Sequence, residues 1–171
     1  NASFQVMVTG MRAIWGEEKT RQWLTAIQAN DPQVYPKNTP IVQAVGAGEV
    51  DVGFVNHYYL FRFLAEEGEG FSARNFHPKN SDPGALVMVS GVGVLSTSEN
   101  QDAAFKFVKF LLSDMGQQYF ASQTFEYPVV EGVKTHRVLV PINGIEAPEI
   151  DLGMLSDLEG TLRLLLDTGV L

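Results

Sequence analysis

Apolar residues recur at helical spacing near the start of the chain. The positions that share one helical face are Phe4, Met7, Val8, Met11, Ile14 and Trp15. This i, i+3, i+4, i+7 pattern predicts a helix over residues 3–15 with one buried stripe, ended by Gly16. Glu17 and Glu18 favour the start of a second helix, because negative charge stabilises a helix N-terminus. We expect Trp23, Leu24 and Ile27 on its inward face and a stop at Asn30-Asp31-Pro32.

Capping residues predict further helices downstream. Thr39 before Pro40 starts a short helix that Gly46 and Gly48 close. Capping boxes are predicted at Ser98 with Gln101, for a helix over 99–112, and at Ser156 with Glu159, for the last helix. Two more helices are expected over residues 60–67 and 114–122. The predicted buried face of the last helix comprises Leu158, Leu162, Leu165 and Leu166.

Short apolar runs between these helices predict strands. Residues 50–55 have the composition of a buried strand in an α/β sheet. Residues 85–89 and 92–95 form one bent strand or two strands around Ser90-Gly91, and residues 71–76 are a candidate edge strand. Helices alternating with apolar strands predict an α/β layered fold.

Composition narrows the class of protein. The chain has 171 residues, 45% hydrophobic and 19% charged, which suits a globular domain with a substantial core. Its net charge of −8 argues against a nucleic acid or an anionic membrane surface as partner. There is no cysteine, so thiolate metal sites are excluded, and no apolar run approaches the ~20 residues of a membrane span.

The candidate chemistry lies at Asn56-His57-Tyr58-Tyr59, between the predicted strand 50–55 and the helix 60–67. A tyrosine hydroxyl ionises near pH ~10, so a phenolate at neutral pH needs a strongly positive partner such as Fe(III). A strand-to-helix corner allows two adjacent side chains to converge, whereas regular structure would separate them. The alternative is that two amphipathic residues open a helix with their hydroxyls in water.

Other candidate sites are weaker. Gly91-Val92-Gly93 lacks the third glycine and the acidic residue of a dinucleotide fingerprint. No Gly-x-Ser-x-Gly motif and no histidine–carboxylate pairing of catalytic spacing is present, so we do not expect an enzyme. His57 is expected to point away from both tyrosines, and His77 and His136 to be solvated.

Three motifs carry a family resemblance. Residues 48–59, with Tyr58-Tyr59 at their end, resemble the tyrosine-pair motif of periplasmic ferric-iron-binding proteins, and the likeness continues through residues 82–91 and 126–129. Those proteins are the substrate-binding components of ABC importers. The resemblance implies a type II periplasmic-binding-protein-like layered fold, mainly the C-terminal lobe with an orphan segment of the first lobe.

The resemblance also implies a ligand set. Tyr58 and Tyr59 correspond to the two phenolate ligands of Fe(III). A synergistic anion, phosphate or carbonate, would rest on the helix N-terminus at Asn1, Ala2 and Ser3, with Asn38 and Asn56 beside it. Free amide donors and the helix dipole suit an anion there, and asparagine donates hydrogen bonds without adding charge.

By the same resemblance, residues 1–90 and 142–171 would belong to the C-terminal lobe and residues 91–141 to the first lobe, most of which is missing. Its helices would then expose apolar faces, so we expect a fragment that self-associates or that was cut from a longer protein. The implied partner is an ABC permease and the implied location is periplasmic, with lipid anchoring of the full-length protein left open. A solute-binding protein for another anion or a small organic ligand, stacked on the tyrosines, stays as the alternative.

Overall fold

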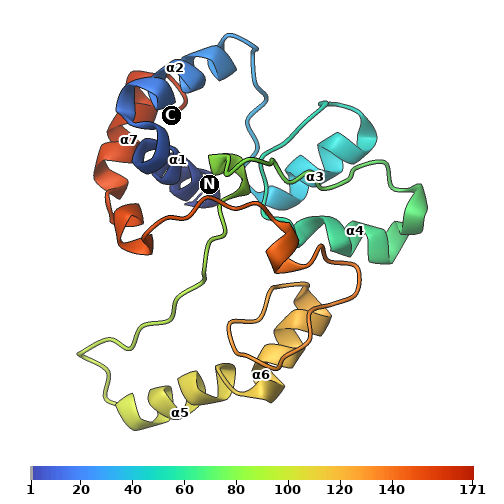
Figure 1. Cartoon of the computed structure of the whole chain (residues 1–171), viewed down its shortest axis with the longest axis vertical. Helices are drawn as coiled ribbons and strands as arrows, with labels where there is room; N and C mark the ends of the chain where they lie inside the picture. The colour runs from blue at the N-terminus through green and yellow to red at the C-terminus, as the bar shows by residue number, and fades with distance from the viewer. Residues whose placement is uncertain (1) are drawn as a thin grey trace. The chain divides into compact units, whose positions relative to one another are not determined.

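A computed structural model describes residues 2–171, and Figure 1 shows its course. The chain divides into two compact units. Unit 1 contains the chain up to Leu86 together with Glu146–Leu171, and unit 2 is Val87–Ile145. The assignment of residues 1–90 and 142–171 to one lobe, and of 91–141 to another, stays a prediction.

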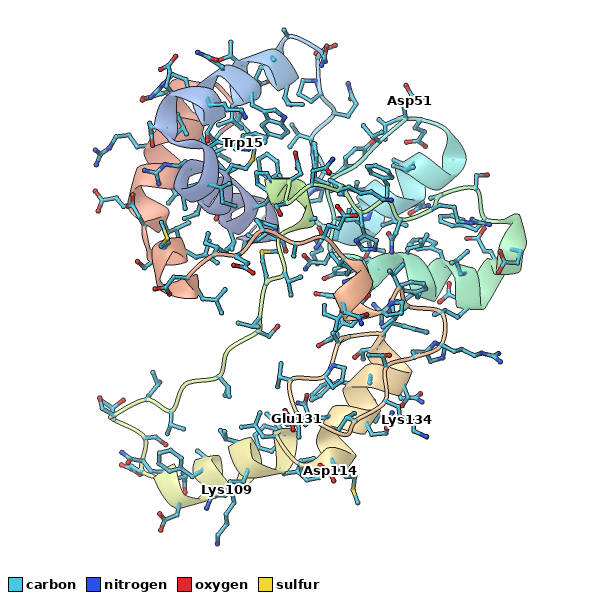
Figure 2. The ribbon with its side chains drawn as sticks, in the orientation of Figure 1. Trp15, Asp51, Lys109, Asp114, Glu131 and Lys134 are labelled. Atoms are coloured by element: carbon cyan, nitrogen blue, oxygen red, sulfur yellow. The ribbon has the colours of Figure 1, made fainter. Side chains whose placement is uncertain are left out.

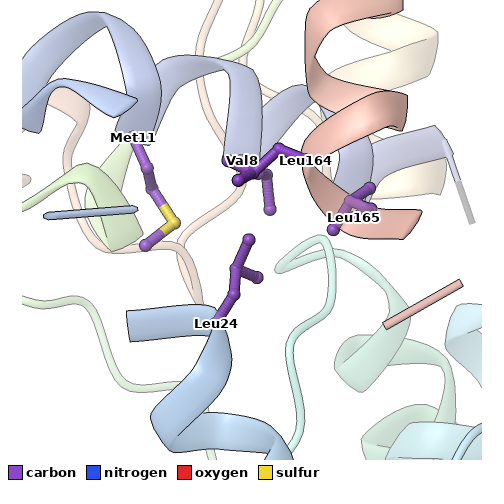
Figure 3. Close-up of a cluster of buried hydrophobic side chains, with 5 residues drawn as sticks. All are labelled: Val8, Met11, Leu24, Leu164 and Leu165. Atoms are coloured by element: carbon purple, nitrogen blue, oxygen red, sulfur yellow. The ribbon is translucent and has the colours of Figure 1, made fainter. Parts of the chain in front are cut away.

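The first core of unit 1 is a helical cluster of α1 (Ala2–Trp15), α2 (Glu17–Gln28) and α7 (Leu158–Asp167). The side chains at its centre, drawn in Figure 3, are Val8, Met11, Leu24, Leu164 and Leu165. The predicted stripe of α1 is confirmed at its buried members. On α7 the prediction is partly wrong, because Leu164 is buried while Leu158 and Leu166 are exposed. The helix is rotated so that Thr161, Leu164 and Leu165 face α1.

Polar contacts join α1 to α7 across a large sequence separation. The hydroxyls of Thr9 and Thr161 are 2.8 Å apart and buried. Arg12 binds Glu17 at 2.6 Å and Asp157 at 2.9 Å. The start of α7 is thus tied to the middle of α1, and the first and last parts of the chain form one body.

Asp157, and not the predicted Ser156–Glu159 pair, caps α7. Its carboxylate accepts a hydrogen bond from the backbone N–H of Gly160 at 3.0 Å. That bond, and then the hydrogen bond from Arg12, lower the pKa of the Asp157 carboxyl below its ordinary value. The sequence pattern missed this cap because Asp157 stands one residue after the serine that fits the capping-box motif.

The second core of unit 1 lies between α3 (Asn38–Ala47) and α4 (Tyr59–Glu67). Its buried members are Val42, Leu60, Phe71 and Ala73. The rings of Phe63 and Phe71 stack with centroids 4.9 Å apart. Both helices begin within two residues of the predicted starts. Short 3₁₀ turns complete the unit at Gly68–Gly70, Pro83–Ala85 and Leu152–Ser156.

The predicted strands are wrong as secondary structure, since residues 2–171 include no strand. Residues 50–55 are largely irregular, and Val52 is 78% exposed. A strand needs a neighbour that accepts and donates its backbone hydrogen bonds. In unit 1 this segment contacts helices instead. The segments 71–76, 85–89 and 92–95 likewise have no ladder partner in the described chain.

Unit 2 contains α5 (Gln101–Leu111), α6 (Asp114–Tyr119) and a π-helical turn over Phe120–Thr124, with a 3₁₀ turn at Ile142–Gly144. Figure 2 labels Lys109 on α5 and Asp114 on α6, both exposed. The predicted Ser98–Gln101 capping box is wrong. Ser98 accepts a bond from the Asn100 amide, while the Gln101 side chain donates to the Ser96 carbonyl, and α5 begins only at Gln101.

Candidate functional site

The segment before the tyrosine pair is held between helices of unit 1. The ring of Phe54 lies 6.0 Å from that of Phe4 on α1 and 5.5 Å from that of Trp23 on α2. On its other side Gly53 approaches Ile41 of α3 so closely that a Cβ there would clash. The predicted strand is therefore an irregular connection that contacts three helices through Gly53 and Phe54, and it brings Asn56 to the beginning of α1.

The two tyrosines lie side by side at the start of α4. Tyr58 is the N-cap residue with φ −70° and ψ −20°, and Tyr59 is the first helical residue. Their ring centroids are 4.7 Å apart with the planes tilted by 30°, and both side chains are half-buried. The side chains of adjacent helical residues usually diverge. The close pairing therefore depends on the turn over residues 56–59 that leads into α4, which we call the corner. Two phenolic groups are thus brought together at the edge of the second core.

Asn56 connects the tyrosines to α1. Its amide nitrogen donates to the hydroxyl of Ser3 and to the hydroxyl of Tyr58, both at 3.1 Å. Ser3 lies in the first turn of α1, where backbone N–H groups have no partner within the helix. Asn56 therefore links Ser3, which was predicted to bind the anion, to Tyr58, which was predicted to bind the metal.

The other predicted anion residues are found at helix starts. Ala2 is the first residue of α1 and is exposed. Asn38 is the first residue of α3 and is 6% exposed. Asn1, the remaining predicted anion residue, lies outside the described residues.

His57 differs from its prediction. Its ring does not point away from the tyrosines but packs edge-on against Tyr58, with centroids 5.5 Å apart, and lies 6.5 Å from the ring of Phe61. An edge-to-face contact between aromatic rings is favourable, and the corner brings the two rings within reach of it.

One polar residue of the corner was missed by the sequence analysis. Asn75 donates its side-chain N–H to the backbone carbonyl of His57 at 2.8 Å. A signal was available, because Asn75 continues the alternation that buries Phe71 and Ala73 and so falls on the inward side of its segment. A polar residue in such a row needs a partner.

Two further observations concern metal-binding clusters and membrane-spanning helices. Within residues 2–171, no three His, Asp or Glu side chains gather closely enough to hold a metal ion. Over the same residues, no helix is both long enough and apolar enough to cross a membrane.

Comparison with known proteins gives the class. Residues 6–141 match the model of the bacterial extracellular solute-binding protein family, and the chain belongs to that family. Its curated relatives include an Fe(3+)-binding periplasmic protein of Serratia marcescens, 35% identical over 172 residues, and the major ferric iron-binding protein of Neisseria meningitidis serogroup B, 35% identical over 171 residues. Each alignment covers 99% of this chain but 50% and 51% of the relative, respectively. The chain thus spans about half the length of these relatives.

Solved structures agree on the fold. The iron-bound HitA protein of Pseudomonas aeruginosa superposes with a TM-score of 0.91 at 35% identity, covering 99% of this chain and 55% of that one. The apo ferric ion-binding protein A of Pasteurella haemolytica gives a TM-score of 0.79 at 21% identity, with the same coverage. The predicted type II periplasmic-binding-protein-like fold is confirmed, although the chain holds only a helix-rich part of it. The resemblance to periplasmic ferric-iron-binding proteins, stated from the sequence motifs, is confirmed as well.

Proposed function

We propose that the chain carries the iron-binding corner of a ferric-iron-binding solute receptor, in which Tyr58 and Tyr59 coordinate Fe(III) as phenolates. The observation that carries the proposal is the paired rings, 4.7 Å apart, at a helix start in a chain whose relatives bear ferric-binding names. Fe(III) is a hard cation that deprotonates its own ligands, so each phenol would lose its proton to solvent as the metal binds.

A synergistic anion, phosphate or carbonate, completes the proposed site. Ala2 and Ser3 lie in the first turn of α1, whose free amides and dipole favour negative charge. Asn56 reaches both Ser3 and Tyr58, so its amide stands between the proposed anion and the proposed metal ligand. Asn38 and Asn1 are the remaining residues proposed to bind the anion, and Asn1 is proposed from the sequence alone.

The wider role follows from the family. The Serratia marcescens relative is named as a periplasmic protein, and we propose the same location for this protein. Its partner would be an ABC permease that takes up the released iron. The 171-residue chain should bind iron more weakly than its longer relatives, because it spans about half their length and coordination positions that their other half could supply would fall to water or buffer anions.

A ferric citrate titration tests the proposal. Tyrosinate-to-iron charge transfer should colour the protein, and the visible band should saturate as ferric citrate is added to the metal-free chain. The double variant Tyr58→Phe, Tyr59→Phe should lose the band while its circular dichroism stays unchanged. Tyr35→Phe, a half-buried tyrosine of the loop before α3, is the matched control and should keep the band.

Two outcomes would contradict the proposal. If the wild-type protein stays colourless at saturating ferric citrate, iron is not its ligand. A coloured double variant would remove the tyrosine pair as ligands.

The alternative cargo is an anion or small organic molecule stacked on the tyrosines. It would have to compete with ring contacts already made, since Tyr58 and Tyr59 lie against each other and the ring of His57 packs edge-on against Tyr58. Such a ligand would also give no charge-transfer band, so the same titration separates the two.

A further inference from the structure

The segment after α4 turns one row of side chains towards the second core. Phe71 and Ala73 are buried, whereas Ser72, Arg74 and Phe76 are exposed. Asn75 is the third member of the inward row and is half-buried. The stacking of Phe71 on Phe63 fixes the beginning of this row against α4, so the position of Asn75 is set by apolar packing four residues earlier.

The side chain of Asn75 contacts the backbone of the corner. The acceptor of its 2.8 Å hydrogen bond is the carbonyl of His57, the residue directly before the tyrosine pair. The bonding group of Asn75 is the amide nitrogen, because a carbonyl can only accept. The backbone bond that closes this turn, from Tyr59 N–H to the Asn56 carbonyl, is longer at 3.3 Å, and so is the first bond of α4, from Phe61 N–H to the Tyr58 carbonyl.

We propose that Asn75 is a positioning residue for the tyrosine pair, which fixes the direction of the Asn56–Tyr59 turn and through it the separation of the two phenolic rings. It would not touch the metal. The inference rests on the proposed function for its consequence in iron binding, but the positioning itself is a property of the metal-free chain. Residues outside a metal's own ligands commonly contribute about 10- to 100-fold to metal affinity by orienting those ligands.

Two substitutions separate positioning from packing. Asn75→Asp keeps the shape of the side chain but turns a carboxylate oxygen towards the His57 carbonyl, so two acceptors repel each other. Asn75→Ala removes the bond without repulsion. If the hydrogen bond matters, the aspartate variant is the worse of the two; if only side-chain volume matters, the alanine variant is worse. Ser72→Ala, on the outward row of the same segment, is the matched control.

The first measurement uses metal-free protein. Hydrogen–deuterium exchange of the backbone amides over residues 57–61 should be faster in Asn75→Asp than in Asn75→Ala, and faster in both than in wild type and Ser72→Ala. Exchange in α1 and α7, in the first core, should be unchanged in all variants. Equal exchange over residues 57–61 in all four proteins would overturn the positioning role, whether or not the protein binds iron.

The second measurement is the ferric citrate titration of the same four proteins. Asn75→Asp should bind iron about tenfold more weakly or worse, with a shifted charge-transfer maximum, and Ser72→Ala should match wild type. An unchanged affinity and an unchanged band in Asn75→Asp would overturn the proposal for the site. A wild-type chain that binds no iron contradicts the proposed function and the consequence for iron, while the exchange data still decide whether Asn75 holds the turn.

Discussion

At the scale of single residues, the side-chain amide of Asn56 connects the two parts of the proposed site. Asn56 donates to Ser3 and to Tyr58 from the same nitrogen, using the two N–H groups of its amide. In the proposed site, the hydrogen bond to Tyr58 would fix the direction in which the Tyr58 oxygen faces the metal.

We expect Asn56→Ala to weaken ferric binding by about tenfold or more, because a hydrogen bond to a charged group contributes roughly 1.5–3 kcal/mol. Asn56→Asp should be worse, since its carboxylate repels the phenolate. Asn30→Ala, an exposed asparagine after α2, is the control, and equal titrations for all three variants would contradict this role for the amide.

At the scale of elements, α3 packs closely against residues 71–76, the segment that follows α4 and holds Asn75 beside the corner. Gly46 on α3 faces the ring of Phe71, and a Cβ built on Gly46 would overlap that ring. Phe71 in turn stacks on Phe63 of α4, so the ring has little freedom to yield. The close approach of two elements thus depends on a missing side chain.

Gly46→Ala should for this reason destabilise the chain, although alanine is normally the better helix residue by up to ~1 kcal/mol. Overpacking of a filled core costs about 1–3 kcal/mol, which outweighs the gain in helix propensity. Urea unfolding measures the difference. Gln43→Ala, on the exposed side of α3, should be neutral or slightly stabilising, and a Gly46→Ala variant more stable than wild type would show that the ring can move.

The cap of α7 gives a pH-dependent prediction. The Asp157 carboxyl has its pKa lowered by the Gly160 amide and then by Arg12, so in the folded chain it stays charged to lower pH than in the unfolded chain. Its contribution to stability is therefore present above the unfolded pKa of about 3.9 and is lost as the pH falls through the folded value.

Asp157→Asn keeps an oxygen that can accept from Gly160 but loses the charge facing Arg12. The variant should melt at a lower temperature than wild type at pH 7, and the gap should close as the pH falls below about 4. Thermal unfolding followed by circular dichroism between pH 7 and pH 3 measures both. Asp151→Asn is the control, because Asp151 also accepts from a glycine amide, at 2.8 Å. A gap that does not change with pH would contradict the charge argument.

The sequence predicted the helices well because their apolar periodicity is local. Val8 and Met11 are buried where the pattern of α1 put them. The strands failed because a strand requires a neighbour elsewhere in the chain, and Val52 meets none. At the site, resemblance pointed to Tyr58 and Asn56, but the bond from Asn75 to the His57 carbonyl depends on how a separate segment packs. The alternation of residues 71–75 indicates that Asn75 faces inward, but it does not indicate which group Asn75 meets.

At the scale of the whole molecule, unit 2 differs from unit 1 in its exposed apolar surface. Every residue of α5 is exposed or half-exposed, and its phenylalanines Phe105, Phe107 and Phe110 are 51–60% exposed. Burying each such side chain would contribute roughly 1.5–3 kcal/mol. A helix with this surface favours association.

The chain should accordingly self-associate as its concentration rises, and the double variant Phe107→Ser, Phe110→Ser should shift the equilibrium towards monomer. Size-exclusion chromatography with light scattering over a hundredfold range of concentration reports the mass. Val34→Ser, an exposed apolar residue of unit 1, is the control and should behave as wild type. A wild-type chain that stays monomeric throughout would contradict the expectation.

The bond from the Asn80 amide to the Glu146 carboxylate, 2.8 Å long, has a consequence for protein engineering. It places Glu146, where the chain re-enters unit 1, beside Asn80, a few residues before the chain leaves unit 1 after Leu86. The intervening segment, residues 87–145, is thus an insertion into unit 1, whose first and last parts are already joined through α1 and α7. A short glycine-rich bridge in its stead would yield a miniature receptor fragment that still carries both tyrosines.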